Sequence, residues 1–173
     1  MFLSLLGLVS LLTSDPKIAS PRVLPAVQNS HDDVVDPALT TLGKLVGGKW
    51  ESLTPIHAEF IYEWRVKGKA IRGTGKIAIG TPNESAAESL YGWDAQKKKV
   101  YYHDYHGAST VYAGYCEMKD GKFVGDFSGL IGDTGHYKFT SEMPDENTLV
   151  STLLIPKDGA WVPLHSSTFH RKR

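Results

Sequence analysis

The sequence predicts an all-β fold: an antiparallel up-and-down β-barrel of about nine or ten strands, preceded by one short α-helix. The stretch from His57 to Ile79 alternates apolar and polar residues with the period of two that is typical of a β-hairpin. Similar stretches follow to the C-terminus at a spacing of about 8–12 residues, and no helix separates them. A meander of this length exposes its edges unless it closes, and a closed barrel of this size leaves an internal cavity.

The chain divides into three parts. Residues 1–20 are predicted to be a signal peptide, because the apolar run Phe2–Leu12 has the length of a signal-peptide core and is too short for a stable membrane span. No basic residue precedes the run and no clean cleavage site follows it, so an apolar segment that packs on the domain stays an alternative. Residues 21–36 form a linker or arm, and residues 37–173 form the barrel domain. We therefore expect an exported protein, periplasmic or secreted.

The segment DPALTTLGKLVGG predicts the helix. Asp36 suits the N-cap, Pro37 suits the first helical position, and Gly47 and Gly48 suit a C-terminal stop. One apolar stripe of this helix consists of Leu39, Leu42, Leu45 and Val46. We expect the helix to lie over one end of the barrel, and Trp50 opens the first strand directly after it.

The 57–79 hairpin has a dry face and a wet face, and the turn is Lys67-Gly68-Lys69. The residues of the dry face are Ala58, Phe60, Tyr62, Trp64, Val66, Ile71, Gly73, Gly75 and Ile77. The two central glycines have no side chains, so we expect open room beside the aromatic wall of Phe60, Tyr62 and Trp64. The alternative is that these rings simply fill the barrel.

The remaining strands follow from alternation and turn signals. We expect them at residues 89–94, 99–106, 109–118, 122–131, 135–143, 148–155 and 160–173. Pro163 lies inside the last of these, so its position must be an unpaired one or a β-bulge.

Composition excludes several classes of protein. The 19 basic and 19 acidic residues of this 173-residue chain give no net charge, which does not suggest a nucleic-acid partner. Cys116 is the only cysteine, so an intrachain disulfide and a thiolate zinc site are excluded, and we expect it to be a small core residue. The sequence contains no Gly-x-Ser-x-Gly elbow or phosphate-binding glycine loop. We expect no cofactor, no metal, and a monomer or weak dimer.

From about Leu42 to its end, the chain resembles a bacterial lipocalin-like (calycin-type) family of domains of unknown function. The residues that carry the resemblance are LVGGKWE, EWRVKGKAIRG, LYGWDAQKKKV and the C-terminal SSTFHRKR. The resemblance implies a β-barrel with an internal pocket, often in an exported protein, and it brings no catalytic signature.

The best polar candidates lie in YYHDYH. In a strand, Tyr102, Asp104 and His106 share one face, while Tyr101, His103 and Tyr105 share the other, and which face points inward stays open. Asp104 and His106 could form a hydrogen-bonded pair that holds an imidazole ready for acid–base chemistry. A solvated rim of tyrosines is the favoured alternative. His165, on the last strand, could join an inner cluster, although a structural or surface histidine is the default.

These observations favour the binding of a small hydrophobic or amphipathic molecule inside the barrel over an enzymatic function. The predicted ligand-binding residues are Phe60, Tyr62, Trp64, Gly73, Gly75, Tyr102, Asp104, His106 and His165. One alternative is an isomerase, cyclase or hydrolase that uses Asp/His acid–base groups in the cavity. Others are haem binding through one histidine and a filled, purely structural barrel.

Overall fold

The computed structural model describes residues 36–107 and 109–172, so the predicted signal peptide and residues 21–35 of the predicted linker lie outside it. Helix α1 (Pro37–Gly43) precedes β1 (Lys49–Ser52), β2 (Ala58–Val66), β3 (Ala70–Ile77), β4 (Ser85–Asp94), β5 (Lys99–His106), β6 (Thr110–Lys119), β7 (Lys122–Ile131), β8 (His136–Asp145), β9 (Thr148–Lys157) and β10 (Ala160–Lys172). Within the described residues, no helix has the length and apolar character that crossing a membrane requires.

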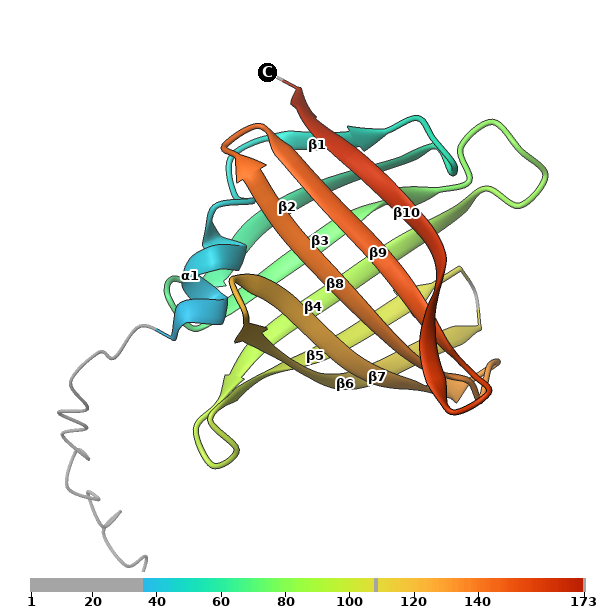
Figure 1. The fold of residues 1–173 in the computed structure, drawn as a ribbon. Helices are drawn as coiled ribbons and strands as arrows, with labels where there is room; N and C mark the ends of the chain where they lie inside the picture. Colours follow the sequence, from blue (N-terminus) through green and yellow to red (C-terminus); the bar gives the residue numbers. More distant parts are fainter. Residues whose placement is uncertain (1–35, 108, 173) are drawn as a thin grey trace, which may run out of the picture. The chain divides into compact units, whose positions relative to one another are not determined.

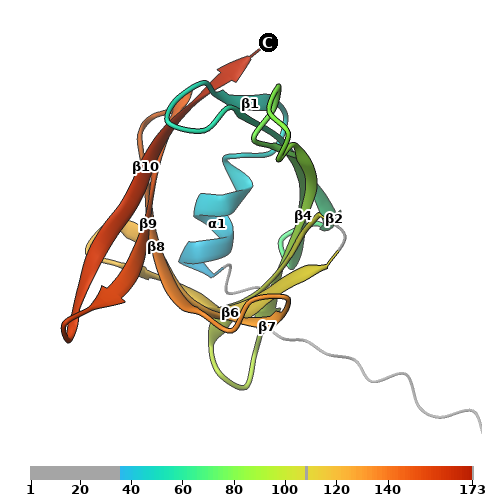
Figure 2. The ribbon, with the colours of Figure 1, turned by 90° about the vertical axis from the view of Figure 1, so that its right-hand side faces the viewer.

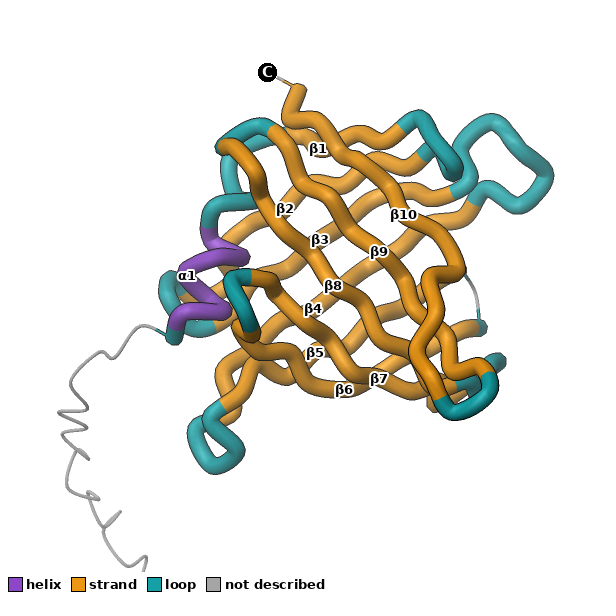
Figure 3. The backbone as a smooth tube through the Cα atoms, in the orientation of Figure 1, coloured by secondary structure: helices purple, strands orange, loops and turns teal. Residues whose placement is uncertain are grey.

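The ten strands of the described chain form a closed, antiparallel, up-and-down barrel, which confirms the predicted fold class (Figures 1 and 3). Each strand pairs with its neighbours in the sequence, and β1 closes the ring by pairing with both β2 and β10. The seam between β1 and β10 is short and joins residues 49–51 to residues 170–172, but it leaves neither end of the meander as a free edge strand. It also brings Trp50 of β1 opposite Arg171 of β10, although these residues are far apart in the sequence.

Helix α1 lies across one end of the barrel, and Figure 2 shows it through the ring of strands. The Asp36 carboxylate caps its N-terminus by accepting hydrogen bonds from the backbone N–H groups of Ala38 (2.8 Å) and Leu39 (3.3 Å). Leu39 and Leu42 are buried against the barrel core. The helix ends at Gly43, before the predicted Gly47 stop. Beyond it the chain straightens enough for Val46 to form a bridge with Tyr62 of β2.

The open room that we expected beside the aromatic wall is present at Phe60 and Tyr62, which line the barrel cavity, but none of it lies directly over Gly73 and Gly75. Tyr62 pairs with Gly73 and Phe60 pairs with Gly75 across β2 and β3. A Cβ atom on Gly73 would lie 2.7 Å from the Tyr62 ring, and one on Gly75 would lie 2.7 Å from the Phe60 ring. The rings therefore cover the glycines, because an aromatic side chain on one strand takes the volume that glycine leaves on the next.

Two further residues of the dry face, Trp64 and Val66, do not line the cavity. A register shift between Trp64 and Val66 leaves Val66 exposed. The Trp64 ring packs against Gly43 at the helix end of the barrel, where an added Cβ would lie 2.7 Å from the ring. In β10, by contrast, the predicted irregularity is present, because the pairing with β9 shifts register between Pro163 and His165.

Candidate functional site

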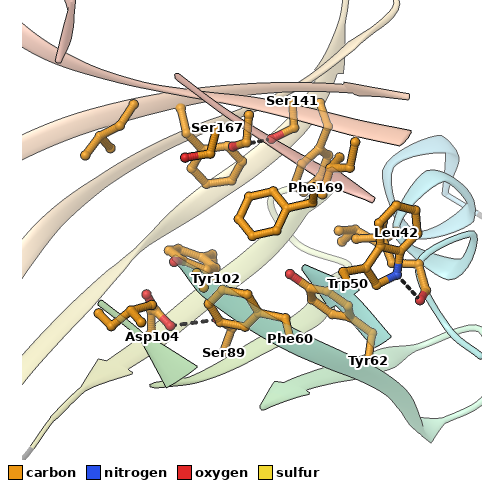
Figure 4. A pocket seen from close by; sticks show the side chains of 18 of the residues that line it. Leu42, Trp50, Phe60, Tyr62, Ser89, Tyr102, Asp104, Ser141, Ser167 and Phe169 are labelled. Carbon is orange, nitrogen blue, oxygen red and sulfur yellow. Dashed lines mark hydrogen bonds between the residues drawn. The ribbon is translucent and has the colours of Figure 1, made fainter. Parts of the chain in front are cut away.

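The barrel encloses a cavity of about 520 Å³, within the range of roughly 300–1,000 Å³ that is typical of ligand sites (Figure 4). It extends from the α1 end, where Leu42 of the helix and Leu45 just after it line the wall, toward the opposite end of the barrel. Aromatic residues form the largest group on its wall. The aromatic lining residues are Trp50, Phe60, Tyr62, Tyr91, Tyr102, Tyr112, Phe123, Phe127, Tyr137, Phe139 and Phe169.

The rings support one another around the wall. Tyr102 meets Phe127 and Phe139 edge to face, with centroids 5.6 and 5.7 Å apart and interplanar angles of 74° and 70°. Tyr112 lies against Phe127 at 5.7 Å and 90°. These separations and angles are those at which aromatic pairs attract one another, so the wall is held in shape by its own packing.

Strand β5 settles which of its faces points inward. Tyr102 and Asp104 are buried and His106 also lines the cavity, whereas Tyr101 and Tyr105 are exposed on the outside. The favoured alternative, a solvated rim of tyrosines, is therefore wrong for the face that carries Asp104. Successive side chains of a strand point to opposite faces, so the direction of one side chain determines the direction of the others.

Asp104 is the most buried ionisable carboxyl group of the cavity wall, with 4% of its surface exposed. The Ser89 hydroxyl on the neighbouring strand β4 donates a 2.7 Å hydrogen bond to Oδ1 of Asp104. The Nε2 atom of His106 lies 2.5 Å from Oδ2. A buried carboxylate needs such partners, because leaving it without them would cost several kcal/mol. The Asp104–His106 pair that the sequence left open is thus formed.

The tyrosines near Asp104 are held in their neutral form. Burial raises the pKa of Tyr62 above its usual range, and the Asp104 carboxylate raises it further. Burial also raises the pKa of Tyr102 well above its usual range, and the charge of Asp104 is the second cause. Both phenols are therefore available as uncharged hydrogen-bonding groups inside an otherwise apolar chamber.

A second polar strip crosses the opposite wall. Ser141, Ser151 and Ser167 stand side by side on β8, β9 and β10, because Ser151 is the register partner of both others. The Ser141 hydroxyl donates to the Ser151 hydroxyl at 2.9 Å. Ser167 is 7% exposed and makes no side-chain hydrogen bond within the described chain. Figure 4 shows Ser141 and Ser167 across the cavity from Ser89, Tyr102 and Asp104.

The wall near the end opposite α1 is braced by Asp133 in the loop between β7 and β8. The hydroxyls of Tyr137 and Tyr112 donate to Oδ2 of Asp133 at 2.7 and 3.1 Å, and the Gly135 N–H donates to Oδ1 at 2.7 Å. The Tyr137 hydrogen bond is the main reason that the pKa of Asp133 lies below its usual value. Through Asp133 the loop is tied to two of the rings that line the cavity.

The structure gathers six of the nine predicted ligand-binding residues on the cavity wall: Phe60, Tyr62, Tyr102, Asp104, His106 and His165. Trp64, Gly73 and Gly75 are not among its lining residues. Sequence reasoning missed Ser89 and the serine strip of β8–β10, together with the rings of β7 and β8. Alternation within residues 122–131 and 135–143 was the available signal for those rings, since Phe123 and Phe127, like Tyr137 and Phe139, lie two or four positions apart.

One group of possible metal ligands lies away from the cavity among the described residues. Atoms of Glu51, His57 and Glu59 lie within 4.8 Å of one another. Lys172 already pairs with Glu51 at 3.0 Å, and Lys49 pairs with Glu59 at 2.6 Å. Because both carboxylates are neutralised by lysines, we assign no metal to this group.

No protein-family model matches the chain, and no curated protein matches it significantly.

Proposed function

We propose that this barrel binds a small hydrophobic or amphipathic molecule in its cavity. The observation that carries the proposal is the aromatic-walled space of about 520 Å³ inside the closed barrel. Apolar walls with a few convergent polar groups are the common composition of small-ligand sites. Asp104, Ser89 and Ser167 supply those polar groups here, and the surrounding rings supply the apolar contact area.

The end of the cavity opposite α1 supports the entry of an apolar ligand. Ile56 and Leu164 line the cavity there, and both are exposed. Exposed apolar side chains beside an apolar pocket commonly mark a binding surface. A ligand that enters past these side chains moves its apolar surface out of water and into contact with apolar protein surface, which is favourable.

We also propose that the protein belongs with the lipocalin-like proteins and is exported. The LVGGKWE and SSTFHRKR segments support the first statement, and the apolar run Phe2–Leu12 supports the second. An exported barrel with a cavity would suit the capture of a poorly soluble molecule outside the cytoplasm.

A fluorescence titration with N-phenylnaphthylamine, a neutral apolar dye, tests the binding proposal. We expect saturable enhancement of the dye's emission by the purified protein, and we expect Ser167→Phe to abolish it by filling the cavity. Ser166→Phe is the matched control, because Ser166 is exposed at the next position of β10. Absence of saturable binding by the natural protein, or equal effects of the two variants, would contradict the proposal.

The Asp104–His106 contact favours a second candidate, an enzyme that acts on an apolar substrate in the same cavity. The carboxylate contacts Nε2 of His106, so Nδ1 remains as the nitrogen that could exchange a proton with substrate. Hydrolysis, isomerisation or cyclisation would use such a group. Turnover of a chromogenic medium-chain ester that is lost in His106→Gln would support hydrolysis, and unchanged turnover in that variant would remove His106 from this role.

A further inference from the structure

The charges around the cavity restrict which ligand it accepts, and this inference rests on the function proposed above. Among the described residues, no lysine or arginine lines the cavity. The two carboxylates on its wall are Asp104 and Glu142, and the two imidazoles are His106 and His165. An anionic ligand would therefore meet negative groups without a permanently charged cation to pair with.

The two carboxylates differ in their surroundings. The Glu142 side chain is 46% exposed and lies 3.1 Å from Nζ of Lys122, so water and a cation both offset its charge. Asp104 is buried, and its carboxylate contacts Ser89, His106 and Tyr102, without a lysine or arginine beside it on the described cavity wall. Any positive charge on His106 is already paired with the Asp104 carboxylate. Asp104 is thus the group whose electrostatic effect is strongest inside the cavity.

The opposite wall offers hydrogen bonds without charge. β4 and β5 face β9 and β10 across the ring of strands, and Figure 4 shows their polar residues on either side of the cavity. Ser167 is 7% exposed and lines the cavity, and its hydroxyl makes no side-chain hydrogen bond to the described residues, so it is free to bind a ligand atom. A molecule between the walls could thus hydrogen-bond to each.

We propose that the cavity selects an amphipathic molecule whose polar head donates a hydrogen bond and carries no negative charge. A hydroxyl or an ammonium head would donate to the Asp104 carboxylate. A carboxylate head would be repelled by Asp104 and would lose its hydration without a compensating cation. The apolar remainder of the ligand would pack on the aromatic wall, and an acceptor atom farther along could take the Ser167 hydroxyl.

Displacement of bound N-phenylnaphthylamine by three matched molecules, decanol, decylammonium and decanoate, tests this selection at neutral pH. We expect decanol and decylammonium to displace the dye at concentrations at least about tenfold lower than decanoate does. Displacement by decanoate at an equal or lower concentration would overturn the inference. Displacement by none of the three from a protein that still binds the dye would also overturn it, while the proposed function would stand. If the protein binds no dye, both the selection inferred here and the proposed function are contradicted.

Two variants locate the effect. Asp104→Asn keeps the shape of the side chain and removes its charge, so we expect the preference over decanoate to fall about tenfold. Asp126→Asn is the matched control, because Asp126 also contacts a histidine, His136 at 2.6 Å, but is exposed on the outer face. We expect Asp126→Asn to keep the full preference. Equal preferences in the two variants would overturn the assignment to Asp104. The comparison of the three molecules uses the natural protein, so it tests the inference even if a variant does not fold.

Discussion

The guanidinium carbon of Arg171 lies 4.5 Å from the centre of the Trp50 ring, at the seam where β10 meets β1. Trp50 is fully buried, and its indole N–H donates to the Leu45 carbonyl at 2.8 Å. Arg171 also donates to the carbonyls of Lys44 and Val46. One pair of residues therefore joins the first strand, the last strand and the segment that follows α1.

Removal of the Arg171 side chain should destabilise the barrel. We expect Arg171→Ala to lower the free energy of unfolding by about 2 kcal/mol, because it removes both the cation–π contact and charged hydrogen bonds to backbone carbonyls. Urea denaturation measures the change. Lys172→Ala is the control: the Lys172 side chain is exposed and makes a single ion pair with Glu51, so we expect a smaller loss of stability than in Arg171→Ala. Equal losses in the two variants would show that the seam does not depend on Arg171.

Gly75 should not tolerate a side chain. A Cβ atom there would lie 1.9 Å from the backbone oxygen of Glu59, which cannot move without breaking the β2–β3 pairing. We expect Gly75→Ala to cost at least about 2 kcal/mol in thermal or urea unfolding.

Gly92 provides the matched control on the adjacent strand β4. A Cβ atom at Gly92 would meet nothing within 4 Å. We expect Gly92→Ala to leave stability unchanged or to raise it by up to about 1 kcal/mol, since alanine restricts the unfolded chain. A Gly75→Ala variant as stable as Gly92→Ala would contradict the close approach of β2 and β3.

Stability should fall at alkaline pH through Tyr112. Burial, and then its hydrogen bond to Asp133, raises the pKa of Tyr112 from 10.0 to about 12. Because the folded protein holds this proton more tightly than the unfolded chain does, its contribution is complete below pH 10 and is lost as the pH rises through about 12. Urea unfolding across this range should show the decline, and Tyr112→Phe should reduce it.

Tyr105→Phe is the comparison for that experiment, because Tyr105 is exposed on the outer face of β5. We expect the decline in Tyr105→Phe to be steeper than in Tyr112→Phe. The same decline in both variants would exclude Tyr112 as its source.

Cys116 should be unreactive while the barrel is folded. Its side chain is 1% exposed, and burial raises the pKa of the thiol well above its usual range, so little thiolate forms near neutral pH. We expect its reaction with a chromogenic disulfide reagent to proceed only at the rate of unfolding and to become fast in urea. Rapid reaction of the native protein would show an opening of the β5–β6–β7 region that the structure does not contain.

Several features follow from local rules and were predictable from the residues alone. Asp36 and Pro37 start the helix, Gly68 makes a turn with a positive φ, and Pro163 coincides with a bulge. Alternation over successive short segments was enough to predict the meander, because a strand with one apolar face carries that period wherever it lies. Closure of the sheet was predictable because an open meander of this length would have exposed unpaired strand edges.

The candidate site was only partly predictable, because alternation shows that two residues share a face but not which face is inside. Asp104 and Tyr102 became cavity residues only once β5 was placed between β4 and β6. The neighbours of Asp104 depend on register as well, since Ser89 reaches it only through the pairing of β4 with β5.

By itself, the sequence determined the number and order of the elements, because turn residues and a period of two act within a few positions of the chain. Tertiary structure alone decided that Phe60 and Tyr62 cover Gly75 and Gly73, and that the room lies instead between Asp104 and Ser167. The reason is that empty volume in a barrel belongs to no single strand. A cavity is the space left after side chains from opposite walls have packed against one another, and that packing depends on closure and register.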